Sequence, residues 1–213
     1  MTYLEIVNRV LRRMRETEVT TVQETPYSIL IGDLVNVVKR EVEDTWDWDA
    51  LRTTLTATTQ ADLFNYVLAG GSNRTRLHNI VNDTSNWTLQ YRDSNWFDKK
   101  FLMVPTEAGS PQFWTVNGVS ENGDTQIDLF PIPDGEYLIR FNGVFPPQDL
   151  EADTDRLLVN PLIVIEGTIA RAISERGEDG GYQEQEQRYN RVLSDLIAIE
   201  ANRRCEEITW QGV

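Results

Sequence analysis

Cysteine and histidine are almost absent from this sequence: Cys205 and His78 are the only residues of their types among 213. A single cysteine excludes a disulfide within the chain and fits a reducing compartment. One cysteine and one histidine are too few for a zinc site of the usual Cys/His spacing. A nucleophile–base pair needs geometry as well as residue type, so His78 in a strand-like run is more simply structural. The sequence therefore predicts no catalytic residue, no cofactor and no metal site.

Basic residues and long apolar runs are also scarce. Twenty Lys and Arg stand against 34 Asp and Glu, which gives a net charge of −14. A surface of this sign repels phosphate, so tight binding of free nucleic acid is not expected. Unbroken apolar runs such as Leu162–Ile165 reach only four residues, far fewer than the ~20 residues of a membrane span. An acidic residue, Glu5, stands where a signal peptide would be apolar, so we expect a cytosolic product without membrane contact.

Helical periodicity is confined to the two ends of the chain. Thr2 and Glu5 have the spacing of a capping box, and Thr25-Pro26 pairs a cap residue with a proline at the first helical position. Gly32, inside the second helix, indicates a close helix contact. Apolar residues recur at three- and four-residue steps in each segment. We expect four helices, at about 2–14, 25–46, 160–177 and 182–204.

The middle of the chain has short strand-like runs separated by turn residues. Asn122-Gly123 is one such turn, and Asp134-Gly135, between two alternating apolar runs, is the strongest hairpin signal. A short helical turn is expected over Ser94–Leu102. The predicted fold class is α+β, a helical bundle built from both chain ends with a β-rich insertion in the middle. The predicted domains are 1–50 with 156–213 for the bundle and 51–155 for the insertion.

Acidic clusters leave a carbohydrate-active alternative open. A muramidase-like pair needs two carboxyls ~5–10 Å apart, one of them in an apolar pocket. Glu184 and Glu186 are clustered but lie in charge-rich, solvated sequence. In Trp46-Asp47-Trp48-Asp49, two indoles could form the wall of a sugar site, although a tryptophan just after a helix is more often a core or interface anchor.

The order of segments resembles that of the head-to-tail adaptor proteins of tailed bacteriophages, the group that includes tail tubular protein A of short-tailed phages. In that family a helix pair precedes a β insertion, which ends in a Gly-x-Pro-x-aromatic segment and a strand ending in proline. A further strand, a proline pair, an acidic loop and a second helix pair follow. The matching segments here are Gly109–Trp114, Leu129–Asp134, Tyr137–Phe141, Pro146-Pro147, Asp149–Asp155, Pro161–Gly177 and Tyr182–Arg204.

This resemblance implies a structural virion protein rather than an enzyme. Such adaptors form a ring, usually dodecameric, between the portal protein and the tail nozzle protein. The ring extends the DNA channel, so duplex DNA passes through it during ejection without tight binding. The expected localisation is the virion neck or tail, after synthesis in the host cytoplasm.

Two sets of residues are expected to serve this role. One is a portal or subunit interface near the C-terminus, because tryptophan and arginine are enriched at interface hot spots. The other is a set of channel-lining acids in the acidic linker. The interface set is Trp210, Ile208, Arg203, Arg204 and Tyr189, and the acid set is Asp149, Glu151, Asp153 and Asp155.

Two alternative functions stay open at this stage. One is a virion-associated peptidoglycan hydrolase, which the clustered carboxylates would serve. The other is a glycan- or cell-surface-binding β module, which the aromatic-rich middle would serve.

Overall fold

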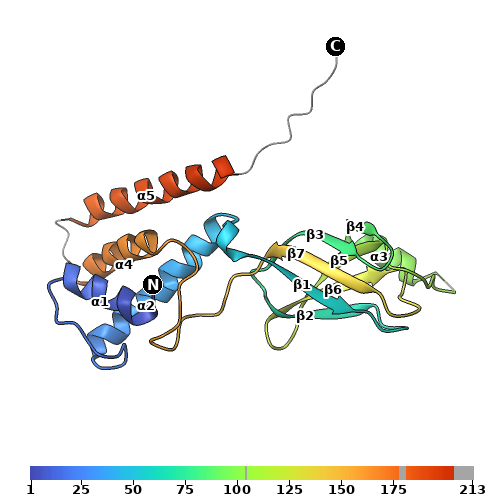
Figure 1. Cartoon of the computed structure of the whole chain (residues 1–213), viewed down its shortest axis with the longest axis horizontal. Helices are drawn as coiled ribbons and strands as arrows, with labels where there is room; N and C mark the ends of the chain where they lie inside the picture. The colour runs from blue at the N-terminus through green and yellow to red at the C-terminus, as the bar shows by residue number, and fades with distance from the viewer. Residues whose placement is uncertain (104, 178–180, 204–213) are drawn as a thin grey trace, which may run out of the picture. The chain divides into compact units, whose positions relative to one another are not determined.

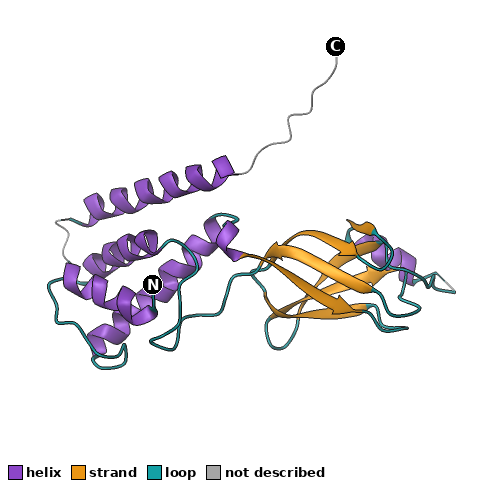
Figure 2. Cartoon of the chain, viewed as in Figure 1, coloured by secondary structure: helices purple, strands orange, loops and turns teal. Residues whose placement is uncertain are grey.

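The computed structural model describes residues 1–103, 105–177 and 181–203. The chain divides into two compact units, Met1–Ala50 with Asp149–Val213, and Leu51–Gln148 (Figures 1 and 2). We call them the helical unit and the β unit, and each is described by itself. None of the described helices combines the length and the apolar content needed to cross a membrane.

Local sequence signals fix the ends of the helices in the helical unit. Thr2 and Glu5 cap each other reciprocally at the start of α1, and Thr25 with Ser28 does the same for α2. Asn160 caps α4 by accepting a hydrogen bond from the N–H of Leu162. These caps satisfy N–H groups that have no partner inside a helix. The helices are α1 (Tyr3–Arg13), α2 (Pro26–Thr45), α4 (Pro161–Glu175) and α5 (Tyr182–Arg203).

The core of the helical unit lies between α1, α2 and α4. A Cβ atom at Gly32 of α2 would lie 2.9 Å from Val22 Cγ1 and closer still to the Tyr3 hydroxyl, which confirms the predicted close contact. Burial and the nearby carboxylates of Asp33, Asp149 and Asp153 raise the pKa of Tyr3 to about 12. The core side chains include Ile6, Val7, Val10, Ile31, Val35, Val38, Ile163 and Val164.

The β unit is one seven-stranded sheet that curls into a nearly closed barrel (orange in Figure 2). Its strand order is β1-β7-β3-β4-β5-β6-β2. All neighbours are antiparallel except β4 and β5. A 3₁₀ turn, Asp49–Leu51, precedes the first strand. The elements are β1 (Arg52–Thr58), β2 (Asn65–Ser72), β3 (Arg76–Asn82), β4 (Trp87–Tyr91), α3 (Ser94–Phe101), β5 (Phe113–Val119), β6 (Asp124–Phe130) and β7 (Leu138–Val144).

The predicted fold class is wrong. The chain is a mixed α/β structure with a barrel-like sheet, and its helices do not form one bundle from both chain ends. A bundle requires every helix to contribute an apolar stripe to a shared centre. Within the described part of α5, only Tyr189 is buried, and the helix packs along α4. The C-terminal helix therefore adds little to the core between α1, α2 and α4.

The hairpin predicted at Asp134-Gly135 is also wrong. β6 pairs with β2 and β5, whereas β7 pairs with β1 and β3. The hairpin forms instead at Asn122-Gly123, where the N–H of Gly123 bonds to the carbonyl of Ser120 between paired β5 and β6. Gly123 has φ of 84°, a left-handed value that glycine tolerates.

Candidate functional site

One cavity in the β unit includes His78, the single histidine of the sequence. This cavity, of about 560 Å³, is lined by Arg52, Thr53, Thr54, His78, Asn79, Asn142 and Gly143. No carboxylate and no thiol is among these lining residues. In the described part of the chain, no group of three or more His, Cys, Asp or Glu residues is placed to hold a metal ion.

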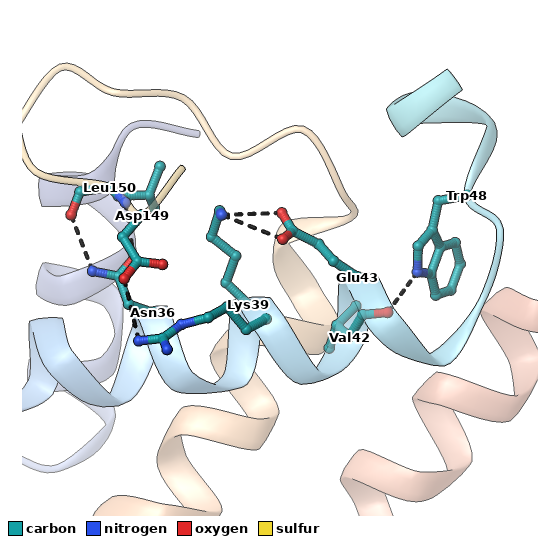
Figure 3. A network of polar contacts seen from close by, with 8 residues as sticks. Asn36, Lys39, Val42, Glu43, Trp48, Asp149 and Leu150 are labelled. Carbon is teal, nitrogen blue, oxygen red and sulfur yellow. Dashed lines mark hydrogen bonds and ion pairs between the residues drawn. The ribbon is translucent and has the colours of Figure 1, made fainter. Parts of the chain in front are cut away.

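The acidic linker is fixed to α2 as an ordered loop. Asn36 donates its side-chain N–H to the carbonyl of Leu150 at 3.0 Å and accepts from the N–H of Leu150 at 2.9 Å (Figure 3). Arg40, one turn further along α2, forms an ion pair with Asp149 at 3.2 Å. Leu150 itself is buried. The two backbone hydrogen bonds to Asn36 and the buried side chain of Leu150 therefore hold the loop against the core of the helical unit.

The acids predicted to line a channel have distinct places in this loop. The carboxylate of Asp153 accepts the N–H of Val22 at 3.0 Å. The carboxylate of Asp155 accepts the N–H groups of Glu151 and Ala152 at 2.9 and 2.8 Å. These backbone hydrogen bonds lower the pKa of Asp155, because they stabilise its charged form. Glu151 is the exposed member of the set. Whether the four acids face DNA stays a prediction.

A buried ion pair lies deeper on the same helix. Lys39 and Glu43, at i and i+4 on α2, are both 0% exposed, and their charged atoms are 3.2 Å apart (Figure 3). Beyond them the indole N–H of Trp48 donates to the carbonyl of Val42 at 2.6 Å. Trp48 is only 4% exposed. The paired-indole sugar site is therefore wrong, because this ring is part of the core of the helical unit.

A second polar cluster fastens α5 to α4. The side chain of Glu166 on α4 is 1% exposed, yet its carboxylate forms ion pairs with Arg13 of α1 at 3.4 Å and with Arg188 of α5 at 3.1 Å. Gln185 of α5 donates to the same carboxylate at 2.5 Å. A buried carboxylate needs such partners, because desolvation is costly. We call Glu166, Arg13, Arg188 and Gln185 the Glu166 clasp.

The Glu166 clasp and one aromatic side chain hold the N-terminal half of α5. Tyr189, 9% exposed, fits where α4 has Gly167; a Cβ atom there would lie 2.8 Å from Tyr189 Cε2. Burial and the nearby carboxylate of Glu41 raise the pKa of Tyr189. At the other end of α5, Glu200 accepts the N–H of Asp49 at 3.2 Å. Tyr189 is thus already packed inside its own chain.

The remaining residues of the predicted C-terminal interface are only partly described. Arg203 is exposed at the end of α5 and pairs with Glu200 at 2.9 Å. Arg204, Ile208 and Trp210 lie outside the described residues. No sequence pattern indicated the other side of the seam between α4 and α5, where α2 completes a cleft of about 350 Å³. Its lining residues are Leu34, Ala170, Arg171, Ser174, Glu175, Tyr182, Glu186 and Tyr189.

Apolar side chains remain at the surface of the same helices. On α5, Ile199 is 51% exposed, and Val192, Leu193, Leu196 and Ile197 are only half-buried. On α2, a second set of large apolar side chains is exposed: Ile29, Leu30 and Val37. Helix faces of this kind commonly mark contacts with another protein. The structure thus offers surfaces for assembly.

Comparison with known families gives the same class of function. The family model described as the SU10 adaptor protein matches residues 1–209, so the chain belongs to the SU10 adaptor family. It is therefore a bacteriophage adaptor, a structural component of the virion. No curated protein matches the chain. The narrower likeness to tail tubular protein A remains a prediction.

Proposed function

We propose that this member of the SU10 adaptor family forms a ring, dodecameric in the virion, between the portal protein and the tail nozzle protein. The main support for the proposal is the exposure of helix α5. This helix has 22 residues, and only Tyr189 among them is buried. A helix normally buries a full apolar stripe against its own domain. The stripe of α5 is left largely at the surface, which supports an attachment to a second protein.

The portal is the partner that we assign to the C-terminal half of α5. Its apolar residues Leu196 and Ile199 lie beyond the Glu166 clasp, so a partner can cover them while the clasp holds the helix in place. The segment that follows contains Trp210, a residue type enriched among interface anchors, together with the apolar Ile208. Both the C-terminal half of the helix and this segment are therefore assigned to portal binding.

Binding to purified portal rings from the phage that encodes this chain tests the assignment. Ile199→Asp should weaken binding about tenfold or more, because it places an unpaired charge in an apolar contact. Asn190→Asp, which adds the same charge on an exposed turn of α5, serves as the matched control. Equal binding by both variants and the wild type would assign the portal contact elsewhere.

Passage of duplex DNA through the ring completes the proposed role. The net charge of −14 supports a passive conduit, because an acidic lining lets phosphate slide without sticking. The loop of residues 149–155 is the proposed source of that lining, with Glu151 as its exposed carboxylate. A hydrolase and a glycan-binding module gain no support from the buried Trp48 and the carboxylate-free cavity of the β unit.

A further inference from the structure

The cleft between α2, α4 and α5 has the chemistry of a receptor for a cationic side chain. Leu34, Ala170 and Tyr189 provide apolar walls, and Glu175 and Glu186 are exposed carboxylates at its edge. Within the part of the chain that the structure describes, neither carboxylate forms an ion pair or a hydrogen bond. The arginine in the cleft, Arg171, is already paired with Glu41. The cleft therefore offers uncompensated negative charge beside apolar surface.

A complementary surface lies on α1 of the same chain. Arg9 lines a shallow hollow of about 380 Å³ together with Met1, Leu4, Glu5, Asn8, Arg12 and Glu18. The carboxylate of Glu5 already accepts a hydrogen bond from the backbone N–H of Thr2. The carboxylate of Glu18 forms an ion pair with Arg12 at 3.3 Å. No described residue forms an ion pair with the exposed Arg9. Among the described residues, Arg9 is thus a cation without an ion-pair partner, in a chain with a large excess of acids.

We propose that these two surfaces meet between copies of the chain: Arg9 of one copy binds the cleft edge formed by Glu175 and Glu186 of the next. The aliphatic part of an arginine side chain can cover apolar surface while its guanidinium pairs with carboxylates. Because the hollow and the cleft are different patches of one molecule, the contact is head-to-tail. Such contacts close into rings when the rotation between copies allows it.

Charge gives an independent reason for this pairing. Each copy carries a net charge of −14, so copies repel one another unless opposite charges are placed at their contacts. The inference deepens the proposed ring and rests on it, since it names the surfaces through which neighbouring copies contact.

Cysteine cross-linking on the full chain tests the contact. In a Cys205→Ser background, a chain carrying both Arg9→Cys and Glu186→Cys is treated with a short bismaleimide at high protein concentration and on portal rings. A head-to-tail contact gives a ladder of covalent oligomers, whereas each single-cysteine chain stays monomeric. Lys99→Cys with Glu186→Cys, which uses an exposed lysine of the β unit, should give no ladder.

Charge exchange provides the second measurement. Arg9→Glu and Glu186→Arg should each weaken ring formation about tenfold or more, because each places like charges together. The double variant restores opposite charges at every contact and should recover most of the loss. Wild-type rings that form without the ladder and without rescue would overturn the contact and leave the ring standing. A wild-type chain that forms no ring with or without the portal would overturn both.

Discussion

Gly167→Ala should loosen α5 selectively, because Tyr189 of α5 packs directly against Gly167 of α4. The added Cβ atom would lie 2.7 Å from Val38 Cγ1 and 2.8 Å from Tyr189 Cε2, below the 3.0 Å that real Cβ atoms keep. Val38 is fully buried, so a shift of its side chain would disturb the packed core. Tyr189 belongs to a helix whose other side chains are exposed or half-buried, so α5 is the element that gives way.

The expected magnitude follows from two opposing effects. Overpacking of a core costs about 1–3 kcal/mol, and replacement of glycine by alanine inside a helix returns about 1 kcal/mol. We therefore expect the global free energy of unfolding to fall by about 1 kcal/mol. The free energy of locally opening α5 should fall by a larger fraction, since Tyr189 is the only buried side chain of this helix in the described range.

Hydrogen exchange read by mass spectrometry separates the two effects. Amides of α5 should exchange about tenfold faster in Gly167→Ala, whereas those of α1 and α2 should change little. Gly32→Ala is the matched control, because its Cβ atom meets Tyr3 and Val22 rather than α5. Unchanged exchange in α5, together with faster exchange in α2, would show that α5 is an integral part of the core and would refute the reasoning.

Four further predictions concern the clasp, the acidic loop, the C-terminus and DNA. Glu166→Gln should lower the unfolding free energy in urea by about 1–2 kcal/mol, since it removes the charge that binds two arginines, whereas Glu184→Gln should change it by less than about 0.5 kcal/mol. The pKa of Asp155 is lowered in the folded protein, so its ionised carboxylate stabilises the fold relative to Asp155→Asn. This stabilisation should be complete above the ordinary pKa of 3.8 and should disappear as the pH falls through the folded pKa. A stability difference between wild type and variant that grows in acid would contradict this. Deletion of Glu206–Val213 should leave the circular-dichroism melt unchanged and weaken portal binding, and a large fall in melting temperature would place that segment in the core. Linear duplex DNA should show no gel shift even at low salt, and micromolar binding that fades with salt would replace the passive conduit with a DNA-gripping channel.

Local signals predicted the helices well. The capping-box spacing at Thr2 and the cap-and-proline pair Thr25-Pro26 each mark a helix start in the structure, because a cap acts over three or four residues of one segment. The short helix predicted over Ser94–Leu102 is confirmed as α3. The division into domains at 50 and 155 remains a prediction about parts that fold alone, which expression of residues 51–148 would test.

Non-local pairing is where the sequence was insufficient. Asp134-Gly135 has turn chemistry, but β6 and β7 find their partners elsewhere in the sheet, and no two-residue signal encodes that choice. The Glu166 clasp was missed for a similar reason, since its members come from three helices. One signal was present: Glu166 directly follows the apolar run Leu162–Ile165, so a carboxylate falls at the end of the most hydrophobic segment of the chain.

The most direct test of the adaptor role is the mass of the chain alone and after mixing with purified portal rings of its own phage. Each copy carries a net charge of −14, so free copies repel one another, and we expect a monomer in isolation at micromolar concentration. With portal rings we predict a complex whose added mass corresponds to a full ring of adaptor copies. A chain that stays monomeric beside intact portal rings would contradict the proposed position in the virion.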